Sequence, residues 1–293
     1  MRITLRQLEI FAAIYREGTI TRAASRIGLS QAATSQALAE IENQLQRRLF
    51  DRNGRRIVSN AAGRELLPAA MEVLDRVRDI EAGAGHRPPD IRLSASLTVG
   101  NYMLPSPIAR FTRRHRDAHF HVAVGNTDFV VRSVRKFESD AGWVEGLARH
   151  PDLAAFPWRE DKLAIVAPPG HPLARRRATP AALADARWVL REKGSGTRAV
   201  FEDAIEGRFR LQHVPVELGG IGAVKRAVMC GAGLGCISRS AVEPELKAGQ
   251  LRLVYTPWLD LRRQITLLVH RQKYIDGGLR KFLQFCGVEL PKT

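Results

Sequence analysis

The chain has 293 residues and a formal net charge of +16, with 46 Lys and Arg against 30 Asp and Glu. This length allows two or three domains with their own cores, and the charge favours polyanionic partners. Three sparse cysteines and the absence of an export-signal pattern predict a cytoplasmic protein without disulfides, and no apolar run reaches the ~20 residues of a membrane span.

Residues 4–17 are predicted to form the first helix. Thr4 and Gln7 have capping-box spacing. An apolar stripe then repeats at helical intervals, formed by Leu8, Phe11, Ala12 and Tyr15. One face of this helix should therefore be buried.

Residues 21–40 have the pattern of two helices joined by a tight turn. Ala23 and Ala24 allow close helix approach, and Gly28 suits the end of the first helix because glycine tolerates positive φ. Ser30 is a natural N-cap for the second helix. This is the pattern of a helix-turn-helix whose second helix enters a DNA major groove.

A two-stranded wing is predicted next, because Asn53-Gly54 is a strong hairpin signal. Ten Arg and five acids within residues 1–60 give an excess of five positive charges, which leaves eleven for the rest of the chain. Charge alone therefore does not locate a DNA site. Arg52, Arg55 and Arg56 fall on the wing.

Residues 61–82 are predicted to form a long helix that Pro68 kinks or breaks early. Apolar residues repeat along it at spacings of 4, 3, 4 and 3, at Leu66, Ala70, Val73, Val77 and Ile80. This heptad pattern favours pairing with a second helix over packing only within its own domain. Residues 83–90 have the Gly and Pro content of a hinge.

Strands and helices alternate from residue 91 onward, which predicts an α/β domain with parallel sheets covered on both faces. The predicted strands are 91–95, 120–124, 141–144, 163–167, 188–190, 214–218, 234–237 and 265–269. The predicted helices are 101–115, 128–137, 197–205, 221–230 and 276–285. The chain would cross from the first lobe to the second near 160–168 and return near 262–270. This gives a two-lobed clamshell with a ligand cleft between the lobes.

These features together resemble the LysR-type transcriptional regulators. The resemblance rests on the N-terminal helix-turn-helix, a wing that includes Leu49-Phe50-Asp51-Arg52, the long helix, the hinge, and Asn101-Tyr102-Met103-Leu104-Pro105 after the first clamshell strand. The fold class is then α/β plus an N-terminal all-α winged helix-turn-helix, with a two-lobed effector domain similar to periplasmic binding proteins.

The resemblance implies a DNA-binding domain at 1–60, a dimerisation helix at 61–82, a hinge at 83–90 and an effector domain at 91–293. Lobe I would span about 91–161 and 268–293, and lobe II about 162–267. The partners implied are double-stranded promoter DNA, a small effector and further copies of the chain, as a dimer and commonly a tetramer. No cofactor and no membrane are expected.

A narrower likeness is to the YeiE/CysL branch of that family, which is linked to sulfur or sulfite metabolism. It rests on the segments 4–9, 100–102, 144–146, 190–198 and 270–273. The chain departs from many members at Gln36, where a basic residue is common, and at Gln46, where Gly is common. It also has Gly220-Ile221-Gly222 where many have hydroxyl residues, which removes ligand donors.

By position in the family motif, Gln31, Ala32, Ser35 and Gln36 would face base edges. A Gln amide suits adenine, a Ser hydroxyl pairs with several edges, and Ala can contact a thymine methyl group. Arginines would supply affinity by neutralising phosphates, although each could instead be a solvated surface charge. The predicted DNA-binding residues are Thr21, Arg22, Arg26, Ser30, Gln31, Ala32, Thr34, Ser35, Gln36, Arg52, Arg55 and Arg56.

A small anion is predicted in the cleft. Residues 96–101 follow a strand and open a helix, and 194–198 offer a second helix start from the other lobe, so free N–H groups would converge on the ligand. The alternative is that these hydroxyls only cap helices. The predicted effector residues are Ser96, Leu97, Thr98, Gly100, Asn101, Tyr102, Asn126, Thr127, Glu145, Ser195, Gly196, Thr197 and Gly220.

Glu145 bears on the kind of anion, because a carboxylate repels an anion unless one of the two carries a proton. Either Glu145 pairs with Arg198 or Lys193, or the effector is a protonated oxyanion such as bisulfite. Sulfite, sulfate and a small carboxylate all fit the predicted size.

Catalysis has no positive signal. His115, His119 and His121 lie at a helix end and on the next strand, and Cys230 and Cys236 lack zinc-ligand spacing, although a redox switch between these thiols stays open. The leading interpretation is a ligand-responsive transcription regulator. The alternative is a DNA-binding architectural protein with no small-molecule effector.

Overall fold

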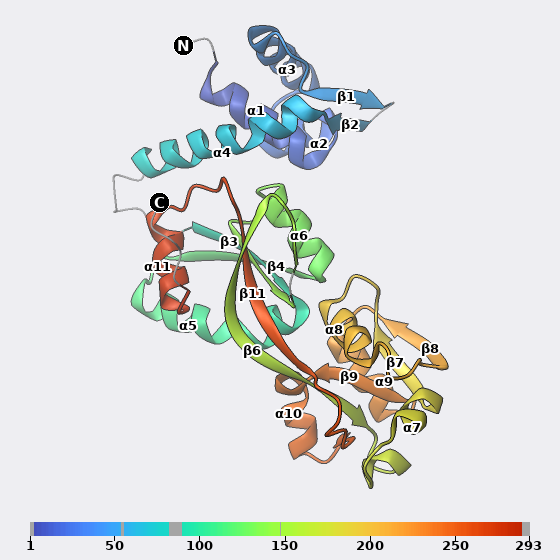
Figure 1. Ribbon diagram of the computed structural model, residues 1–293. Helices are drawn as coiled ribbons and strands as arrows, with labels where there is room; N and C mark the ends of the chain where they lie inside the picture. The colour runs from blue at the N-terminus through green and yellow to red at the C-terminus, as the bar shows by residue number, and fades with distance from the viewer. Residues whose placement is uncertain (1–2, 54–55, 82–89, 147, 289–293) are drawn as a thin grey trace.

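The structure is a computed structural model that describes residues 3–53, 56–81, 90–146 and 148–288. An N-terminal helical domain lies on one side of the long helix α4 (Ala61–Glu81), and a two-lobed α/β domain lies on the other side (Figure 1). None of the helices in these ranges is long and apolar enough to cross a membrane.

The N-terminal domain contains the predicted helix-turn-helix. Its helices are α1 (Leu5–Glu17), α2 (Ile20–Ile27) and α3 (Gln31–Leu45). Thr4 and Gln7 form the predicted capping box, Gly28 has a φ of 68°, and Ser30 Oγ accepts from Ala33 N at 3.1 Å. These local signals are confirmed.

The end of α3 explains one departure from the family pattern. Gln46 caps this helix with a φ of 52°, in the left-handed region that favours glycine. The backbone therefore keeps the conformation that glycine adopts at this place, and the glutamine has to accept it.

The wing consists of β1 (Phe50–Asn53) and β2 (Arg56–Ser59), which pair antiparallel. Gly54 and Arg55 at its tip lie outside the described residues, as does the predicted hinge up to residue 89. Helix α4 continues through Pro68, so the predicted early break is wrong. Pro68 is buried, and the next residue on its N-terminal side, Leu67, packs in the core of the N-terminal domain.

Within the described ranges, the two-lobed domain is built on a nine-stranded sheet with the order β4-β3-β5-β11-β6-β9-β7-β8, and β10 pairs with β6. The strands are β3 (Asp90–Ser96), β4 (His119–Gly125), β5 (Ala141–Glu145), β6 (Leu153–Ala167), β7 (Arg187–Arg191), β8 (His213–Leu218), β9 (Leu234–Ser238), β10 (Arg252–Leu253) and β11 (Arg262–His270).

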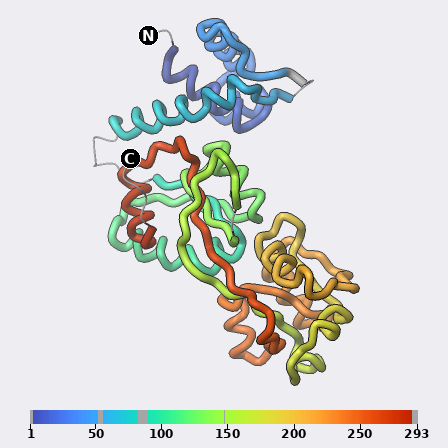
Figure 2. The backbone as a smooth tube through the Cα atoms, in the orientation of Figure 1, coloured from blue at the N-terminus to red at the C-terminus, as the bar shows by residue number. Residues whose placement is uncertain are grey.

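The sheet is mixed, so the prediction of purely parallel sheets is wrong. Strands β6 and β11 run antiparallel to each other through both lobes, side by side in Figure 2. Among the strands of the described residues, β3 pairs in parallel with β4 and β5, and β7 pairs in parallel with β8 and β9. Strand β6 carries the chain from lobe I to lobe II and β11 carries it back, so the two strands run in opposite directions. Lobe I was predicted to resume at about residue 268. Ile265 and Leu267 already pack in the core of lobe I, so the chain re-enters this lobe a few residues earlier.

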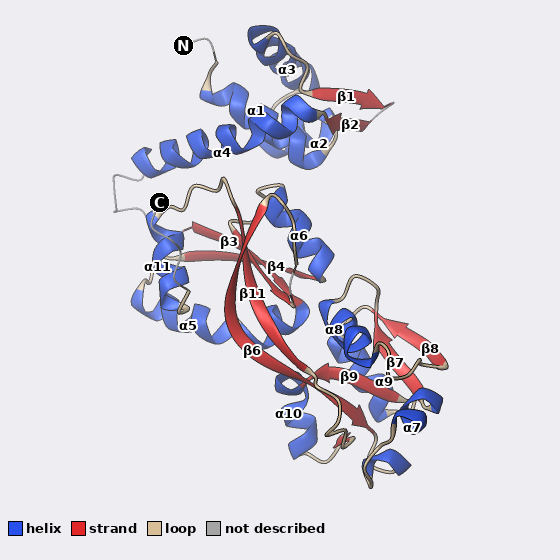
Figure 3. Cartoon of the chain, viewed as in Figure 1, coloured by secondary structure: helices blue, strands red, loops and turns tan. Residues whose placement is uncertain are grey.

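Helices cover both faces of each lobe (Figure 3). In lobe I, α6 covers one face, and α5 and α11 cover the other around Trp143 and Phe282; in lobe II, α8 lies opposite α9 and α10. The helices are η1 (Val99–Met103, one π-helical turn), α5 (Pro105–Arg114), α6 (Thr127–Arg135), η2 (Pro172–Ala174), α7 (Pro180–Asp185), α8 (Gly196–Ile205), α9 (Ile221–Met229), α10 (Arg239–Lys247) and α11 (Gly277–Phe285). The predicted single helix 101–115 is therefore two elements, and α5 starts with Pro105 at its first position.

Candidate functional site

The predicted base-reading surface lies on α3. The side chains on it are exposed at Gln31, Ala32 and Gln36 and half-buried at Ser35. Gln36 Nε2 donates to Glu40 Oε1 at 3.0 Å, and Thr21 Oγ1 donates to Gln31 Oε1 at 3.3 Å. Both amides are therefore oriented by a neighbour on the same surface, and both remain accessible to a partner.

Thr34 does not belong to this surface. It is fully buried, and its Oγ1 donates to the backbone oxygen of Ser30 at 2.9 Å. The position faces the domain core beside Leu38, so the prediction that Thr34 contacts DNA is wrong. Ser30 is exposed, but its hydroxyl oxygen caps α3.

The predicted phosphate-contacting arginines differ in their surroundings. Arg22 and Arg26 are exposed and form ion pairs with Glu17 at 3.2 and 2.7 Å, so a phosphate has to compete with this carboxylate. Arg56 is exposed on β2. The Arg52 side chain and all of Arg55 lie outside what the structure describes.

Arg263 of β11 bonds residues of both lobes and was not predicted. Its side chain is 1% exposed, and Nε donates to Asp161 Oδ2 at 2.7 Å. Nη1 donates to Thr197 Oγ1 of lobe II at 2.9 Å, and Nη2 donates to Thr98 Oγ1 of lobe I at 3.2 Å. One guanidinium therefore joins both lobes and the crossover strand β6.

Glu145 faces this guanidinium, with 3.9 Å between Glu145 Oε1 and Arg263 Nη1. The predicted pairing of Glu145 with Arg198 is wrong, because Arg198 bonds Glu202 and Glu217 instead. The other predicted partner, Lys193, is exposed. The buried cluster therefore sets one cation against two carboxylates, those of Glu145 and Asp161.

Two of the predicted effector residues, Ser96 and Thr127, have buried hydroxyl oxygens with no hydrogen-bond partner in the part of the chain that the structure describes. Ser195 is also buried, and it precedes α8 without capping it through its side chain. Buried polar atoms without partners are rare in proteins and are normally satisfied by water or a ligand. These hydroxyls and the first backbone N–H groups of α8 can therefore still form hydrogen bonds with a bound ligand.

The two lobes touch at Gly196. A Cβ atom at this position would lie 2.7 Å from Thr127 Oγ1 and 2.9 Å from the backbone oxygen of Glu145. A cavity of about 380 Å³ opens beside this contact, and Thr127, Glu145, Lys193, Ser195 and Gly196 are among the residues that line it. The sequence-predicted residues of both lobes therefore meet at one place.

The other predicted effector residues lie further out or have structural roles. Leu97 packs against the core of lobe II, and Asn126 Oδ1 caps α6 by accepting from Phe129 N at 2.9 Å. Gly100 leaves no room for a side chain next to Val124. Asn101, Tyr102 and Gly220 are exposed or half-buried.

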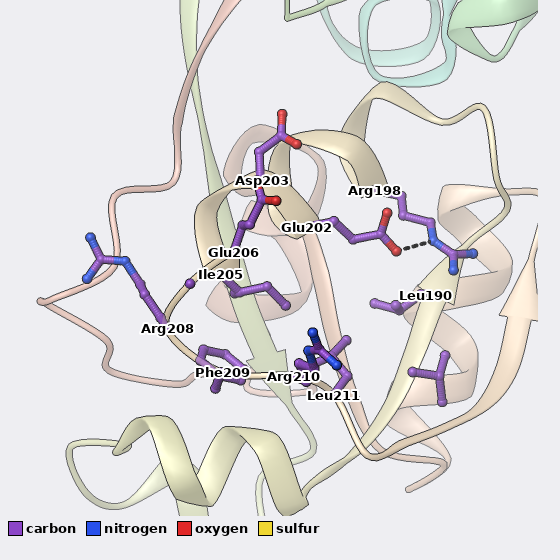
Figure 4. A pocket seen from close by; sticks show the side chains of 12 residues that line it. Leu190, Arg198, Glu202, Asp203, Ile205, Glu206, Arg208, Phe209, Arg210 and Leu211 are labelled. Carbon is purple, nitrogen blue, oxygen red and sulfur yellow. Dashed lines mark hydrogen bonds and ion pairs between the residues drawn. The ribbon is translucent and has the colours of Figure 1, made fainter.

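A second cavity, of about 770 Å³, lies on lobe II between α8 and the segment before β8 (Figure 4). Arg198, Glu202 and Asp203 line both cavities, so α8 separates them. The dashed line in Figure 4 marks the bond from Arg198 to Glu202 that keeps this guanidinium away from Glu145.

Metal and thiol chemistry find no support in the described ranges. No cluster of three or more His, Cys, Asp or Glu there could hold a metal ion. Burial raises the pKa of the Cys236 thiol to about 12, which disfavours the reactive thiolate, whereas Cys230 is exposed.

Comparison with known proteins gives matches along the chain. Residues 5–64 match the model for the bacterial regulatory helix-turn-helix protein of the lysR family, and residues 84–290 match the LysR substrate binding domain. The chain is 41% identical to the uncharacterized HTH-type transcriptional regulator YeiE of Escherichia coli over 286 residues, 98% of each chain. It is 28% identical to the HTH-type transcriptional regulator CysL of Bacillus subtilis, over 89% of each.

Two solved structures share the fold over nearly the whole chain. A full-length OxyR variant from Pseudomonas aeruginosa has a TM-score of 0.76 at 19% identity, over 98% of this chain and 94% of that one. ArgP from Mycobacterium tuberculosis has a TM-score of 0.72 at 18% identity, over 96% and 94%.

Proposed function

Because this chain belongs to the LysR family of transcriptional regulators, we propose that a compact, protonated oxyanion binds between its lobes and controls promoter binding. The chain carries a helix-turn-helix for DNA and an effector-binding domain, and its relatives are named regulators, not enzymes. The anion, and its identity as sulfite or a related sulfur species, are the proposed part.

The observation that carries the proposal is a pair of buried hydroxyls, Ser96 Oγ and Thr127 Oγ1, that have no hydrogen-bond partner among the described residues. Ser96 lies two positions before Thr98, which bonds Arg263, and Thr127 faces Gly196 at the contact between the lobes. Hydroxyls can donate to an oxyanion without adding charge. The uncapped start of α8 at Ser195 adds backbone N–H groups and the positive end of a helix dipole.

The charges of the cluster favour a protonated anion. Arg263 faces both Glu145 and Asp161, so an anion carrying only negative charge would meet an unfavourable field. A protonated oxyanion can donate its proton to Glu145 while its other oxygens accept from the hydroxyls. This supports bisulfite over sulfate, which carries no proton near neutral pH.

Calorimetric titration of the full chain with sulfite, sulfate and acetylserine tests the proposal. We expect heat from sulfite and little from sulfate. Thr127→Val should weaken sulfite binding about tenfold, because one charge-assisted hydrogen bond is lost. Thr112→Val is the matched control on α5, where the hydroxyl only bonds backbone oxygens of its own helix. No heat from any of the three ligands would remove the sulfur-anion assignment.

The alternative is an architectural DNA-binding protein that needs no effector. Footprinting of promoter DNA with and without sulfite separates the two, because only the proposed regulator changes its protected region.

We further propose that the chain works in the cytoplasm as a dimer, and in pairs of dimers as a tetramer. Support for the dimer comes from the face of α4 with Val73 and Ile80, which are 41% and 76% exposed.

A further inference from the structure

The N-terminal domain is docked on lobe I of its own chain through Phe137. This side chain follows α6 and is 2% exposed, in the same apolar cluster as Phe11, Ile14 and Met71 of the N-terminal domain. Its φ of 54° lies in the left-handed region, which is rare for an aromatic residue and persists only where the surroundings impose it. The ring of Phe137 also lies 4.3 Å from that of His270 on β11.

A row of buried charged side chains lies next to this contact. Lys273 Nζ donates to Asp75 Oδ2 of α4 at 2.5 Å and lies 2.9 Å from Asp140 Oδ1 of lobe I. The Lys273 side chain is 3% exposed. Arg92 Nη2 bonds the same Asp140 oxygen at 3.1 Å, and Arg92 N donates to Asp140 Oδ2 at 2.8 Å. One ammonium is therefore shared by a carboxylate from each domain.

A second group of contacts, closer to the surface, lies next to this row of charges. Tyr274 makes a hydrogen bond with Asp79 of α4, and the Arg76 guanidinium lies 4.8 Å from the centre of the Tyr274 ring. Helix α4 is therefore held along its last turns by the segment that links β11 to α11, while Val73 and Ile80 of the same helix stay exposed.

Four elements of lobe I run between this contact and the interlobe cleft. Each has a cleft residue near one end and a residue of the contact or its neighbour near the other: β3 with Ser96 and Arg92, α6 with Thr127 and Phe137, β5 with Glu145 and Asp140, and β11 with Arg263 and His270. Lobe I lies between α4 and lobe II in Figure 1. A shift of these elements at the cleft would therefore reach α4 directly.

We propose that Phe137, Lys273, Asp75 and Arg16 form a docking surface, the domain contact, by which lobe I holds its own N-terminal domain and passes changes in the cleft to it. Arg16 of α1 belongs to this surface because its guanidinium donates to the backbone oxygen of Phe137. Lys273 lies between a carboxylate of each domain, so loss of its ammonium would leave Asp75 and Asp140 buried without the cation that joins them. The docking does not depend on a ligand. The transmission of a signal rests on the proposed function.

Hydrogen exchange of the full-length chain tests the docking. Phe137→Ala and Lys273→Met should each speed exchange about tenfold or more in peptides from the last turns of α1 and α4, and leave lobe II peptides unchanged. Phe285→Ala is the matched control, because this ring lies in lobe I under Arg110 and Arg114 and outside the domain contact. It should leave exchange in α1 and α4 as in the unaltered chain.

Tyr274→Phe is the mild variant should either buried substitution prevent folding. It removes only the hydroxyl that bonds Asp79 and should give a smaller acceleration in the same α4 peptides. Unchanged exchange of α4 in Phe137→Ala and in Tyr274→Phe would overturn the docking.

Transmission is tested by promoter binding with and without sulfite. In Tyr274→Phe and Phe137→Ala we expect calorimetry to show sulfite binding as in the unaltered chain, with a weakened effect of sulfite on promoter affinity. A full effect in both variants would overturn transmission and leave the docking in place. Absence of sulfite binding in the unaltered chain would instead contradict the proposed function, and the exchange data would still decide the docking.

Discussion

Arg16 Nη2 donates a 2.7 Å hydrogen bond to the backbone oxygen of Phe137, which lies 121 positions further along the chain. Burial, with the nearby charges of Arg92, Arg26 and Arg78, lowers the pKa of Arg16 to about 10. The Arg16 guanidinium is therefore buried near other cations, and its hydrogen bond to Phe137 joins α1 to the loop after α6. The N-terminal domain and lobe I are therefore joined by side chains as well as by the chain itself.

Gly196→Ala should weaken the closed arrangement of the lobes. The added methyl group would lie 2.7 Å from Thr127 Oγ1 and 2.9 Å from a backbone oxygen, and the backbone cannot yield. We expect a loss of about 1–3 kcal/mol in the free energy of unfolding and weaker sulfite binding. Urea denaturation and calorimetry measure the two effects.

Gly222→Ala on α9 is the control for this change, because beyond its own helix backbone and chain neighbours no described atom lies within 4 Å of the added methyl group. It should be neutral or stabilise by up to about 1 kcal/mol through helix propensity. Equal effects of the two alanines would contradict close contact between the lobes at Gly196.

Arg263→Met should be strongly destabilising, because Asp161 and Glu145 would remain buried without their cation. Loss of one partner of a buried pair costs about 3–5 kcal/mol. The neighbouring Arg262→Met removes an exposed guanidinium that pairs with Asp260, and should leave the melting temperature close to that of the unaltered chain. Thermal unfolding of both variants under one buffer condition compares them, and similar melting would refute a central role for Arg263.

Gln36→Ala and Arg56→Ala should affect DNA binding in different ways. Loss of the exposed Gln36 amide should reduce discrimination between matched and scrambled sites by about 1–3 kcal/mol. Loss of Arg56 should weaken binding to both sites alike and lower the salt slope by about one. Anisotropy titrations at several salt concentrations distinguish these outcomes, and equal loss on both sites for Gln36→Ala would contradict its role as a base reader.

Sequence patterns predicted the elements whose signals are local. The capping box of Thr4 and Gln7 and the cap at Ser30 act within one helical turn, so a single segment contains all the information. Arg263 was missed because its partners Asp161 and Thr98 lie 102 and 165 positions away. A charged residue beside the apolar run 265–269 was the available signal, and only the crossing of β6 and β11 shows what it bonds.

The same limit explains the errors in the predicted sites. Thr34 shares a helical face with Leu38 and so faces inward, a periodicity that already argued against its place in the predicted DNA-binding set. The partner of Glu145 was sought among the cations of the segment 193–198, whereas it comes from β11. Pairings between distant segments depend on strand order, which the pattern of apolar residues does not determine.

Val73→Glu should dissociate the proposed dimer. Val73 is 41% exposed on α4, and a carboxylate between two paired helices would lose its hydration. Sedimentation at several protein concentrations should show the dimer shift to monomer. Val58→Glu on the wing makes the same change at a valine that is 53% exposed and should leave the assembly intact. A dimer that survives Val73→Glu would show that this face of α4 is not the interface.

The domain contact should also weaken in mild acid because of His270. Burial lowers the pKa of His270 to about 4, although the charge of Asp152 opposes this shift and Arg135 and His150 add to it. The unfolded chain takes up this proton near the ordinary pKa of 6.5, so between pH 6.5 and 4 it binds more protons than the folded chain. Stability must then fall as the pH falls through this window.

His270→Asn isolates this effect, because its side-chain oxygen can replace Nδ1 as the acceptor for Gln272 N. Asp140 does not contribute in the same window: burial alone would raise its pKa, but Lys273 and Arg92 lower it to about 2, so its stabilisation is lost only below its ordinary value of 3.8. In urea denaturation from pH 7 to 4.5, the unaltered chain should lose about 1–2 kcal/mol more than His270→Asn. Parallel pH curves would mean that His270 is solvated in the folded protein.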